Sequence, residues 1–432
     1  MRELKLDVSE EPIPLGVLST LQPRTLNEPL LPNLKDFEVK ETPADLIPFV
    51  PLFLSHKTTR IEIRFATVPP PATVASMIIN FPKLCPYMQK ICLHPLPDDA
   101  TIVRAASEML LTCNLDTLRY LFVDSALTKE TTQVAHQLHN LSGLWLYFLE
   151  PTPLPVISLP DLTELDVEYY HDHDWLQAFH RARLSKLKEV TFHARCDQVG
   201  NFLEAFEIAL ASSASTLSEF GFYTWHSWNP NYHSLLSFKQ LVELIIQFSC
   251  GGSCSSSLDD ETITTLTQAM PKLETLQLGN TPCRTPNNVT IQGLIALAHH
   301  CPCLLKLCIH FQTESSAAAL TDEVTPVISP GESHLSRNDC MLATLEVGRI
   351  PLSQQSRLPV FLTLLRIFPR LLLIEYANRE WKWVADTARL SGKINSLVHR
   401  SGKTPSSALV SYSDAPIVSG LDAGNPPNGG QG

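Results

Sequence analysis

One short pattern of apolar residues recurs along most of this chain and limits what it can fold into. The pattern is L-x-x-L-x-L, in which L stands for a large apolar residue and x for any residue. Copies begin at Met1, Leu34, Thr58, Met88, Leu118, Leu141, Leu162, Leu187, Leu217, Leu241, Leu273, Leu304, Leu342 and Leu371. Apolar residues fill 41 of the 42 L positions in these 14 copies, Thr58 being the exception, whereas the whole chain is 44% hydrophobic. The pattern is therefore a structural repeat and not a result of composition.

The period of the repeat predicts the architecture. Successive copies start 21 to 38 residues apart, close to the period of about 20–29 residues in leucine-rich repeats, which the pattern resembles. The final L-x-L supplies the alternation of a β-strand, and one unit cannot bury its apolar face without neighbours. We therefore predict an α/β fold, a leucine-rich-repeat solenoid in the form of a right-handed horseshoe. Parallel strands would line its concave face and helices its convex face.

Amphipathic segments between the strands predict the helices. They cover residues 72–81, 101–111, 198–211, 261–270, 289–299 and 358–368, and residues 43–56 also read as a repeat helix. Asp259 and Asp260 are suitable N-caps for the helix that begins at Glu261. A proline often stands two residues before the pattern, where it ends the helix because the residue before proline avoids the α region.

We expect about 14 irregular repeats to form one solenoid over residues 1–390. Residues 312–338 read as a polar insertion within it. The remainder, residues 391–432, is rich in Ser, Pro and Gly toward its end, and this composition predicts a disordered tail.

The net charge and the cysteine content exclude several classes of partner and of cellular location. The formal charge of -11 argues against nucleic acid or an anionic membrane as the main partner, because both require a clustered basic surface. The sequence has no apolar run of about 18 residues and no apolar signal segment near Met1. Eleven scattered cysteines without a framework spacing suit reduced thiols. We expect a cytoplasmic or nuclear protein, monomeric, without a cofactor.

Three places of each copy should point outward from the concave face: the third, the fifth and the one after the last. Over the 14 repeats these places hold 14 acidic and 6 basic residues. The acids are Glu3, Asp7, Asp36, Glu38, Glu62, Asp124, Glu164, Asp166, Glu168, Glu189, Glu219, Glu243, Glu346 and Glu375. The bases are Lys5, Lys40, Arg60, Arg64, Lys90 and Lys306. The bases fall almost entirely in the first four repeats, so the middle of the face should be acidic.

The fifth and sixth repeats carry large aromatic residues at the same places. Together with the acids of the seventh repeat they form our candidate partner-binding site: Tyr120, Phe122, Trp145, Tyr147, Glu164, Asp166 and Glu168. Aromatic residues are enriched at binding hot spots, and the acidic rim suits a basic or aromatic-seeking protein segment. The alternative is that aromatic residues simply fit strands. Trp225, His226 and Trp228 could extend the surface, or pack against neighbouring repeats.

Motifs for catalysis or metal binding are lacking. His171, Asp172, His173 and Asp174 are consecutive, so they cannot all converge on one ion without an unusual turn, and we expect a solvated loop there. Cys250 and Cys254 have no matching second pair of cysteines. The sequence contains no phosphate-binding glycine loop, no G-x-S-x-G and no H-E-x-x-H. We expect a binding module, not an enzyme.

One segment points to a family. Residues 291–307 read I-Q-G-L-I-A-L-A-H-H-C-P-C-L-L-K-L, which resembles the cysteine-containing repeat G-L-x-x-L-A-x-x-C-P-x-L-x-x-L of F-box leucine-rich-repeat proteins. The segment from Cys85 to Ile91 repeats its second half. Residues 368–376, followed by Trp381 and Trp383, look like the C-terminal region of fungal F-box-like proteins.

The resemblance implies the substrate-recognition part of a ubiquitin ligase receptor. An F-box is a helical segment placed before the repeats, and in this chain Met1 itself opens a repeat. We therefore expect a ligase adaptor to bind only a longer form that carries an F-box. The alternatives are a stand-alone scaffold and a small-GTPase regulator; the latter would need an exposed arginine on a repeat turn and more regular units.

Overall fold

The computed structural model describes most of the chain in separate segments. These are residues 1–7, 15–21, 29–96, 99–123, 138, 140–148, 159–169, 184–195, 199, 202–224, 230–248, 258–279, 288–313, 340–347, 352–376 and 379–400. The predicted insertion at 312–338 therefore lies outside the described residues, apart from its first two. So do the tail after residue 400, His171–Asp174, Trp225, His226, Trp228, Cys250 and Cys254.

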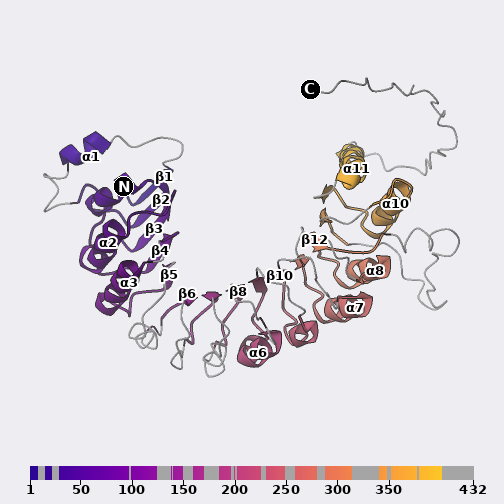
Figure 1. The fold of residues 1–432 in the computed structure, drawn as a ribbon, viewed down its shortest axis with the longest axis horizontal. Helices are drawn as coiled ribbons and strands as arrows, with labels where there is room; N and C mark the ends of the chain where they lie inside the picture. The colour runs from indigo at the N-terminus through magenta and orange to yellow at the C-terminus, as the bar shows by residue number, and fades with distance from the viewer. Residues whose placement is uncertain are drawn as a thin grey trace, which may run out of the picture.

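Fourteen strands form one parallel sheet in which each strand lies beside its neighbours in sequence, from β1 to β14. They are β1 (Glu3–Asp7), β2 (Asp36–Thr42), β3 (Arg60–Phe65), β4 (Lys90–His94), β5 (Tyr120–Val123), β6 (Gly143–Phe148), β7 (Glu164–Tyr169), β8 (Glu189–Ala194), β9 (Glu219–Thr224), β10 (Glu243–Phe248), β11 (Thr275–Leu278), β12 (Lys306–Ile309), β13 (Thr344–Glu346) and β14 (Leu373–Glu375). The sheet curves into an open arc, with strands on the inner side and helices on the outer side (Figure 1).

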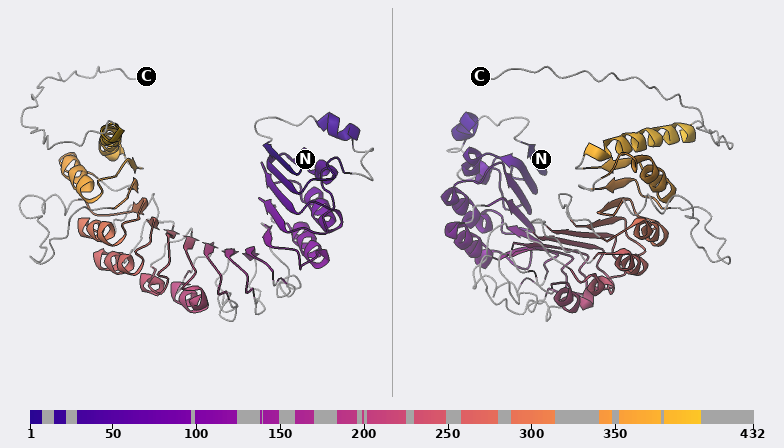
Figure 2. Two further views of the ribbon diagram at one scale, coloured as in Figure 1. Left: turned by 180° about the vertical axis from the view of Figure 1, so that it is seen from behind. Right: turned by 45° about the vertical axis from the view of Figure 1, so that its right-hand side comes forward.

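The helices pack along the outer face of this arc, as both views of Figure 2 show. They are α1 (Leu15–Leu21), α2 (Pro71–Leu84), α3 (Ala100–Thr112), α6 (Phe202–Ala209), α7 (Asp260–Ala269), α8 (Ile291–His300), α10 (Arg357–Ile367) and α11 (Lys382–Arg400). The described segments also contain the 3₁₀ helices η2 (Ala44–Leu52), η4 (Ala211–Ser213), η5 (Tyr232–Leu235) and η6 (Arg379–Trp381). The predicted α/β fold with an all-parallel sheet is confirmed.

Proline ends four of these helices in the predicted way. The residues before Pro86, Pro271, Pro302 and Pro369 are the C-caps of α2, α7, α8 and α10. Their ψ angles lie between 63° and 79°, outside the α region that proline disfavours in the residue before it. Residues 43–56 differ from the prediction of a repeat helix. They contain η2, a 3₁₀ helix with Pro48 and Pro51 inside it, and neither proline has the N–H that an α-helix requires.

The two aspartates predicted as N-caps have separate roles. Asp259 caps α7, because its side chain accepts a hydrogen bond from the Thr262 amide at 2.8 Å. Asp260 instead reaches the start of α8, the helix of the following repeat. It accepts from the amides of Thr290 at 2.7 Å and Gly293 at 3.0 Å, and from the Thr290 hydroxyl at 2.7 Å. One of the predicted caps thus joins two repeats.

The L positions of the pattern form the core between the sheet and the helices. Ile61, Val190 and Leu244, for example, are at most 1% exposed. Helix α11 contacts β14 and runs to Arg400. The predicted boundary after residue 390 therefore falls inside a helix. No helix in the described segments is long and apolar enough to cross a membrane.

Candidate partner-binding surface

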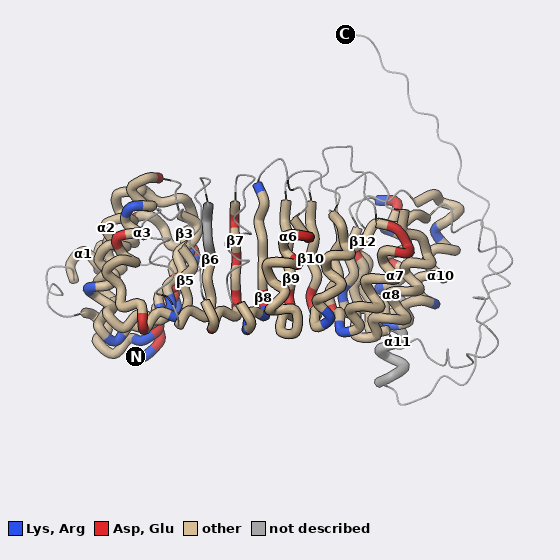
Figure 3. Tube along the Cα trace, turned by 90° about the horizontal axis from the view of Figure 1, so that it is seen from below, with Lys and Arg blue, Asp and Glu red and all other residues tan. Residues whose placement is uncertain are grey.

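Parallel pairing places equivalent positions of successive repeats side by side on the inner face of the sheet. At the third place of the pattern, Glu164 of β7 pairs with Glu189 of β8, which pairs with Glu219 of β9, which pairs with Glu243 of β10. Neighbouring strands in a sheet lie about 4.8 Å apart. Four carboxylates therefore form a continuous line across four strands, which we call the glutamate row; Figure 3 marks the acidic positions in red, clearest on β7.

The carboxylates of the glutamate row are not ion-paired in the part of the chain that the structure describes. No ion pair within the described segments involves any of its four carboxylates, each of which is at least partly exposed. Partial burial, together with the charge of Glu189, raises the pKa of Glu164. Partial burial also raises the pKa of Glu219, followed by repulsion from Glu189, Glu243 and Glu164. Like charges on adjacent strands are destabilising, so the row would gain from a cationic ligand.

Aromatic side chains adjoin the first residue of the row. Tyr120 of β5 pairs with Gly143 of β6, and Gly143 pairs with Glu164. A β-carbon on Gly143 would lie 2.5 Å from Cδ1 of Tyr120 and 3.1 Å from Cζ of Phe122. Both rings therefore lie over the backbone of β6 at Gly143. Their centroids are 6.3 Å apart and their planes differ by 16°. The two rings occupy the space between β5 and the glutamate row.

Trp145 continues this aromatic surface along β6. Its ring stacks on His94 of β4, with centroids 5.4 Å apart and planes 30° apart. Its indole Nε1 is buried and has no hydrogen-bond partner among the described residues. Tyr147 lies further along β6, paired with Glu168 of β7, but its side chain is outside the described part of the structure. We call the partly exposed rings of Tyr120, Phe122 and Trp145 the aromatic shelf.

The other two predicted acids differ from Glu164. Glu168 is 7% exposed, and Arg195 at the end of β8 donates to it at 2.6 Å. Asp166 lies 3.7 Å from Nε2 of His193. Burial and the nearby Arg195 lower the pKa of His193, so this histidine is neutral near pH 7 and the contact is not an ion pair there. His193 also stacks on Tyr223, with centroids 4.9 Å apart. Of the three acids predicted at the rim, Glu168 is therefore ion-paired within the chain, whereas Glu164 has no ion pair in the described segments.

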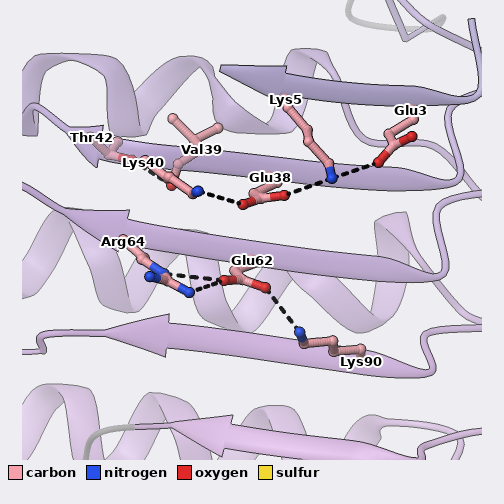
Figure 4. Close-up of polar contacts among 9 residues, drawn as sticks. All are labelled: Glu3, Lys5, Glu38, Val39, Lys40, Thr42, Glu62, Arg64 and Lys90. Atoms are coloured by element: carbon pink, nitrogen blue, oxygen red, sulfur yellow. Dashed lines mark hydrogen bonds and ion pairs between the residues drawn. The ribbon is translucent and has the colours of Figure 1, made fainter. Parts of the chain in front are cut away.

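Four basic residues of the first repeats, Lys5, Lys40, Arg64 and Lys90, are likewise paired within the chain (Figure 4), whereas Arg60 is exposed. Lys5 lies 3.0 Å from Glu3 and 3.5 Å from Glu38. Glu62 accepts from Arg64 at 2.7 Å and from Lys90 at 2.9 Å. Burial raises the pKa of Glu62, but the hydrogen bonds from Lys90 and Arg64 outweigh it and lower the pKa overall. The inner face thus carries networks of paired charges on β1 to β4, and on β7 to β10 a row of acids without an ion pair in the described segments.

Toward the other end of the sheet, some inner positions are buried, whereas Lys306 and Glu375 are exposed. Gln277 of β11, Cys308 of β12 and His310 just beyond it are 8%, 0% and 4% exposed. Burial lowers the pKa of His310 to about 4. On the span from β5 to β10, partly exposed aromatic residues adjoin acids that have no ion pair in the described segments; Glu375 and Tyr376, at and just beyond the end of β14, are exposed as well.

The repeat pattern predicts that Glu189, Glu219 and Glu243 lie on the inner face, but the binding site predicted from the sequence does not include them. The signal that could have found them is positional. Glutamate occupies the third place in four successive copies, which read T-E-L, K-E-V, S-E-F and V-E-L around it. Equal places in successive repeats of a parallel sheet become neighbours, so this run predicts a line of carboxylates.

Metal and small-molecule chemistry is not evident in this surface. Within the described segments, no three His, Cys, Asp or Glu side chains lie together in a way that could hold a metal ion. A groove of about 580 Å³ between η5 and α7 is lined by Lys239, Gln240 and Lys272 among others, without any acid, histidine or cysteine. The seven cysteines in described segments are free thiols.

Comparison with known proteins adds no assignment. No protein-family model matches the sequence, and a search of curated proteins finds no significant relative.

Proposed function

We propose that this chain is a leucine-rich-repeat protein whose concave face binds a basic, extended segment of a partner protein. The observation that carries the proposal is the glutamate row, four carboxylates on adjacent strands without an ion pair in the described structure. Four of the basic residues near the other end of the same face form ion pairs with Glu3, Glu38 and Glu62. The part of the face on β7 to β10 therefore presents net negative charge.

The distance between neighbouring strands favours a partner segment that runs across the strands of the sheet. Four strands about 4.8 Å apart give a row about 14 Å long. In an extended peptide, side chains on one face are about 6.7 Å apart, so three alternate residues span about 13 Å. We infer that the partner carries lysine or arginine at three alternate positions, all facing the row. An apolar or aromatic neighbour of this segment would meet the aromatic shelf.

We further propose that the module is the substrate-recognition part of an F-box-like ubiquitin ligase receptor. This rests on the resemblance of residues 291–307, and two packing features support it. Cys301 is buried and its thiol lies 3.5 Å from the Met270 carbonyl of the preceding repeat. A β-carbon on Gly293 would lie 2.6 Å from Oδ1 of Asp260, which explains a glycine at that place of the repeat.

The test uses defined peptides and two variants of equal charge change. The row variant is Glu164→Gln, Glu189→Gln, Glu219→Gln and Glu243→Gln. The control carries Glu108→Gln, Glu207→Gln, Glu261→Gln and Glu274→Gln, positions outside the inner face. We expect the row variant to bind a peptide with three alternate basic residues at least about tenfold more weakly, with a smaller salt dependence. Equal affinities of the two variants would show that the row is not the binding site.

The ligase role is tested separately. An affinity capture from a fungal lysate with the unsubstituted chain and with a product extended at its N-terminus should recover the cullin ligase adaptor only with the extended product. Recovery of basic partners without any ligase component from either product would leave a stand-alone binding scaffold.

A further inference from the structure

The position of Gly143 creates a composite site at the junction of the aromatic shelf and the glutamate row. Tyr120, Gly143 and Glu164 are consecutive in the register of β5, β6 and β7. Because Gly143 has no side chain, the Tyr120 and Phe122 rings extend over β6 toward Glu164. A carboxylate that has no ion pair in the described structure therefore stands next to two roughly parallel, partly exposed rings.

Nearby cations of the chain are held elsewhere. Lys90, at the same place on β4, lowers the pKa of Glu164 by its charge, yet its ammonium donates to Glu62 at 2.9 Å. Arg119, on the turn before β5, donates to the carbonyl of Asn140 at 2.9 Å. The charge and the hydrogen-bonding capacity of Glu164 are thus left for a ligand.

We propose that this junction is an arginine-binding subsite, so that the partner residue over Gly143 is arginine and not lysine. The inference rests on the proposed binding of a basic segment and specifies one of its residues. A guanidinium is planar and weakly hydrated, so it stacks on aromatic rings while its N–H groups bind a carboxylate in a fork. A lysine ammonium is a compact, strongly hydrated charge that gains less from the rings. The aromatic rings and the carboxylate of Glu164 therefore suit the two faces and the N–H groups of a guanidinium better than they suit an ammonium.

The experiment compares four peptides of one length on a Ser/Gly background with three alternate basic positions. One has arginine at all three positions and one has lysine at all three. The other two have a single arginine, at the first or at the last basic position. Affinities are measured by fluorescence anisotropy at fixed ionic strength. The unsubstituted protein is compared with Tyr120→Leu/Phe122→Leu and with a control, Tyr87→Leu/Leu111→Ala, whose residues are exposed outside the shelf. Thermal unfolding checks that each variant is folded.

We expect the all-arginine peptide to bind the unsubstituted protein about three- to tenfold more tightly than the all-lysine peptide. Only one of the single-arginine peptides should keep this advantage, because one end of the row adjoins the shelf. The advantage should fall to about onefold in Tyr120→Leu/Phe122→Leu and remain in the control. Equal binding of arginine and lysine peptides, or an arginine advantage that persists without the two rings, would overturn the subsite while leaving the basic-segment function intact. Failure of every peptide to bind would overturn both.

Discussion

Tyr120 lies over Gly143, so closely that a β-carbon on the glycine would be 2.5 Å from Cδ1 of the tyrosine ring. Real β-carbons do not approach other atoms to this distance, and the glycine is therefore required by the position of the ring. The glycine occupies the place in β6 at which β7 to β10 all carry glutamate. One missing side chain thus separates the aromatic shelf from the glutamate row and brings the rings next to Glu164.

The first prediction concerns this contact. Gly143→Ala should lower the free energy of unfolding by about 1–3 kcal/mol, the usual cost of adding a methyl group to a packed site. In a Tyr120→Ala background the main clash is absent, so the same substitution should cost at least about 1 kcal/mol less there. Urea denaturation of the four proteins of this cycle measures the difference. Gly16→Ala is the control, because its β-carbon would meet nothing within 4 Å. Equal costs of Gly143→Ala in both backgrounds would contradict the proposed contact.

The fold was largely predictable because the pattern contains the alternation of buried and exposed residues in each strand. Every strand from β1 to β14 begins at the third place of a copy. Proline before the pattern marked helix ends through a local steric rule. Residues 44–52 were less predictable, because an apolar segment with two prolines satisfies a helical pattern while lacking helical hydrogen bonds.

The site was only partly predictable, since the pairing of strands in different repeats determines which of its side chains are adjacent and which of its charges are neutralised. The inward direction of Tyr120, Phe122 and Glu164 followed from place within the pattern. The neutralisation of Glu168 did not, because Arg195 stands beyond the three places that were considered inward-facing. The role of Gly143 was also hidden. A glycine has no side chain whose chemistry could suggest a role. Only the register between β5 and β6 shows that the Tyr120 ring lies over Gly143.

The second prediction is a pH dependence of stability that originates in the glutamate row. Partial burial and neighbouring glutamates raise the pKa of Glu164 and Glu219. Between the unfolded pKa of about 4.3 and the raised folded pKa, the folded state binds more protons than the unfolded state. The contribution of these groups to the free energy of unfolding therefore falls as pH rises through that window. His193 acts in the opposite direction, since its lowered pKa reduces stability as pH falls below about 6.5.

Glu189→Gln isolates the effect of the row, because Glu189 is the leading charged neighbour of both carboxyls. We expect this variant to be more stable than the unsubstituted protein at pH 7, with the advantage shrinking as pH approaches 4.5. Glu108→Gln, on the exposed side of α3, should show no such trend. Urea midpoints measured at several pH values provide the comparison, and a pH-independent difference for Glu189→Gln would rule out repulsion within the row.

The third prediction concerns the connection between repeats at α7 and α8. Asp260 accepts three hydrogen bonds from residues of the next repeat, whereas Asp259 accepts one from the start of its own helix. Loss of an N-cap costs about 1 kcal/mol, and loss of several hydrogen bonds to a charged group costs more. Asp260→Ala should therefore lower the free energy of unfolding by about 2–4 kcal/mol and Asp259→Ala by about 1 kcal/mol.

Hydrogen exchange distinguishes a connection between repeats from a simple cap. In Asp260→Ala, the amides of Thr290 and Gly293 lose their acceptor, so exchange should accelerate at the start of α8 although the substituted residue lies in α7. In Asp259→Ala, faster exchange should be confined to the first turn of α7. In repeat proteins, stability depends on contacts between neighbouring repeats. If Asp260→Ala lowered the free energy of unfolding no more than Asp259→Ala, the α7–α8 contact would be held by apolar packing alone.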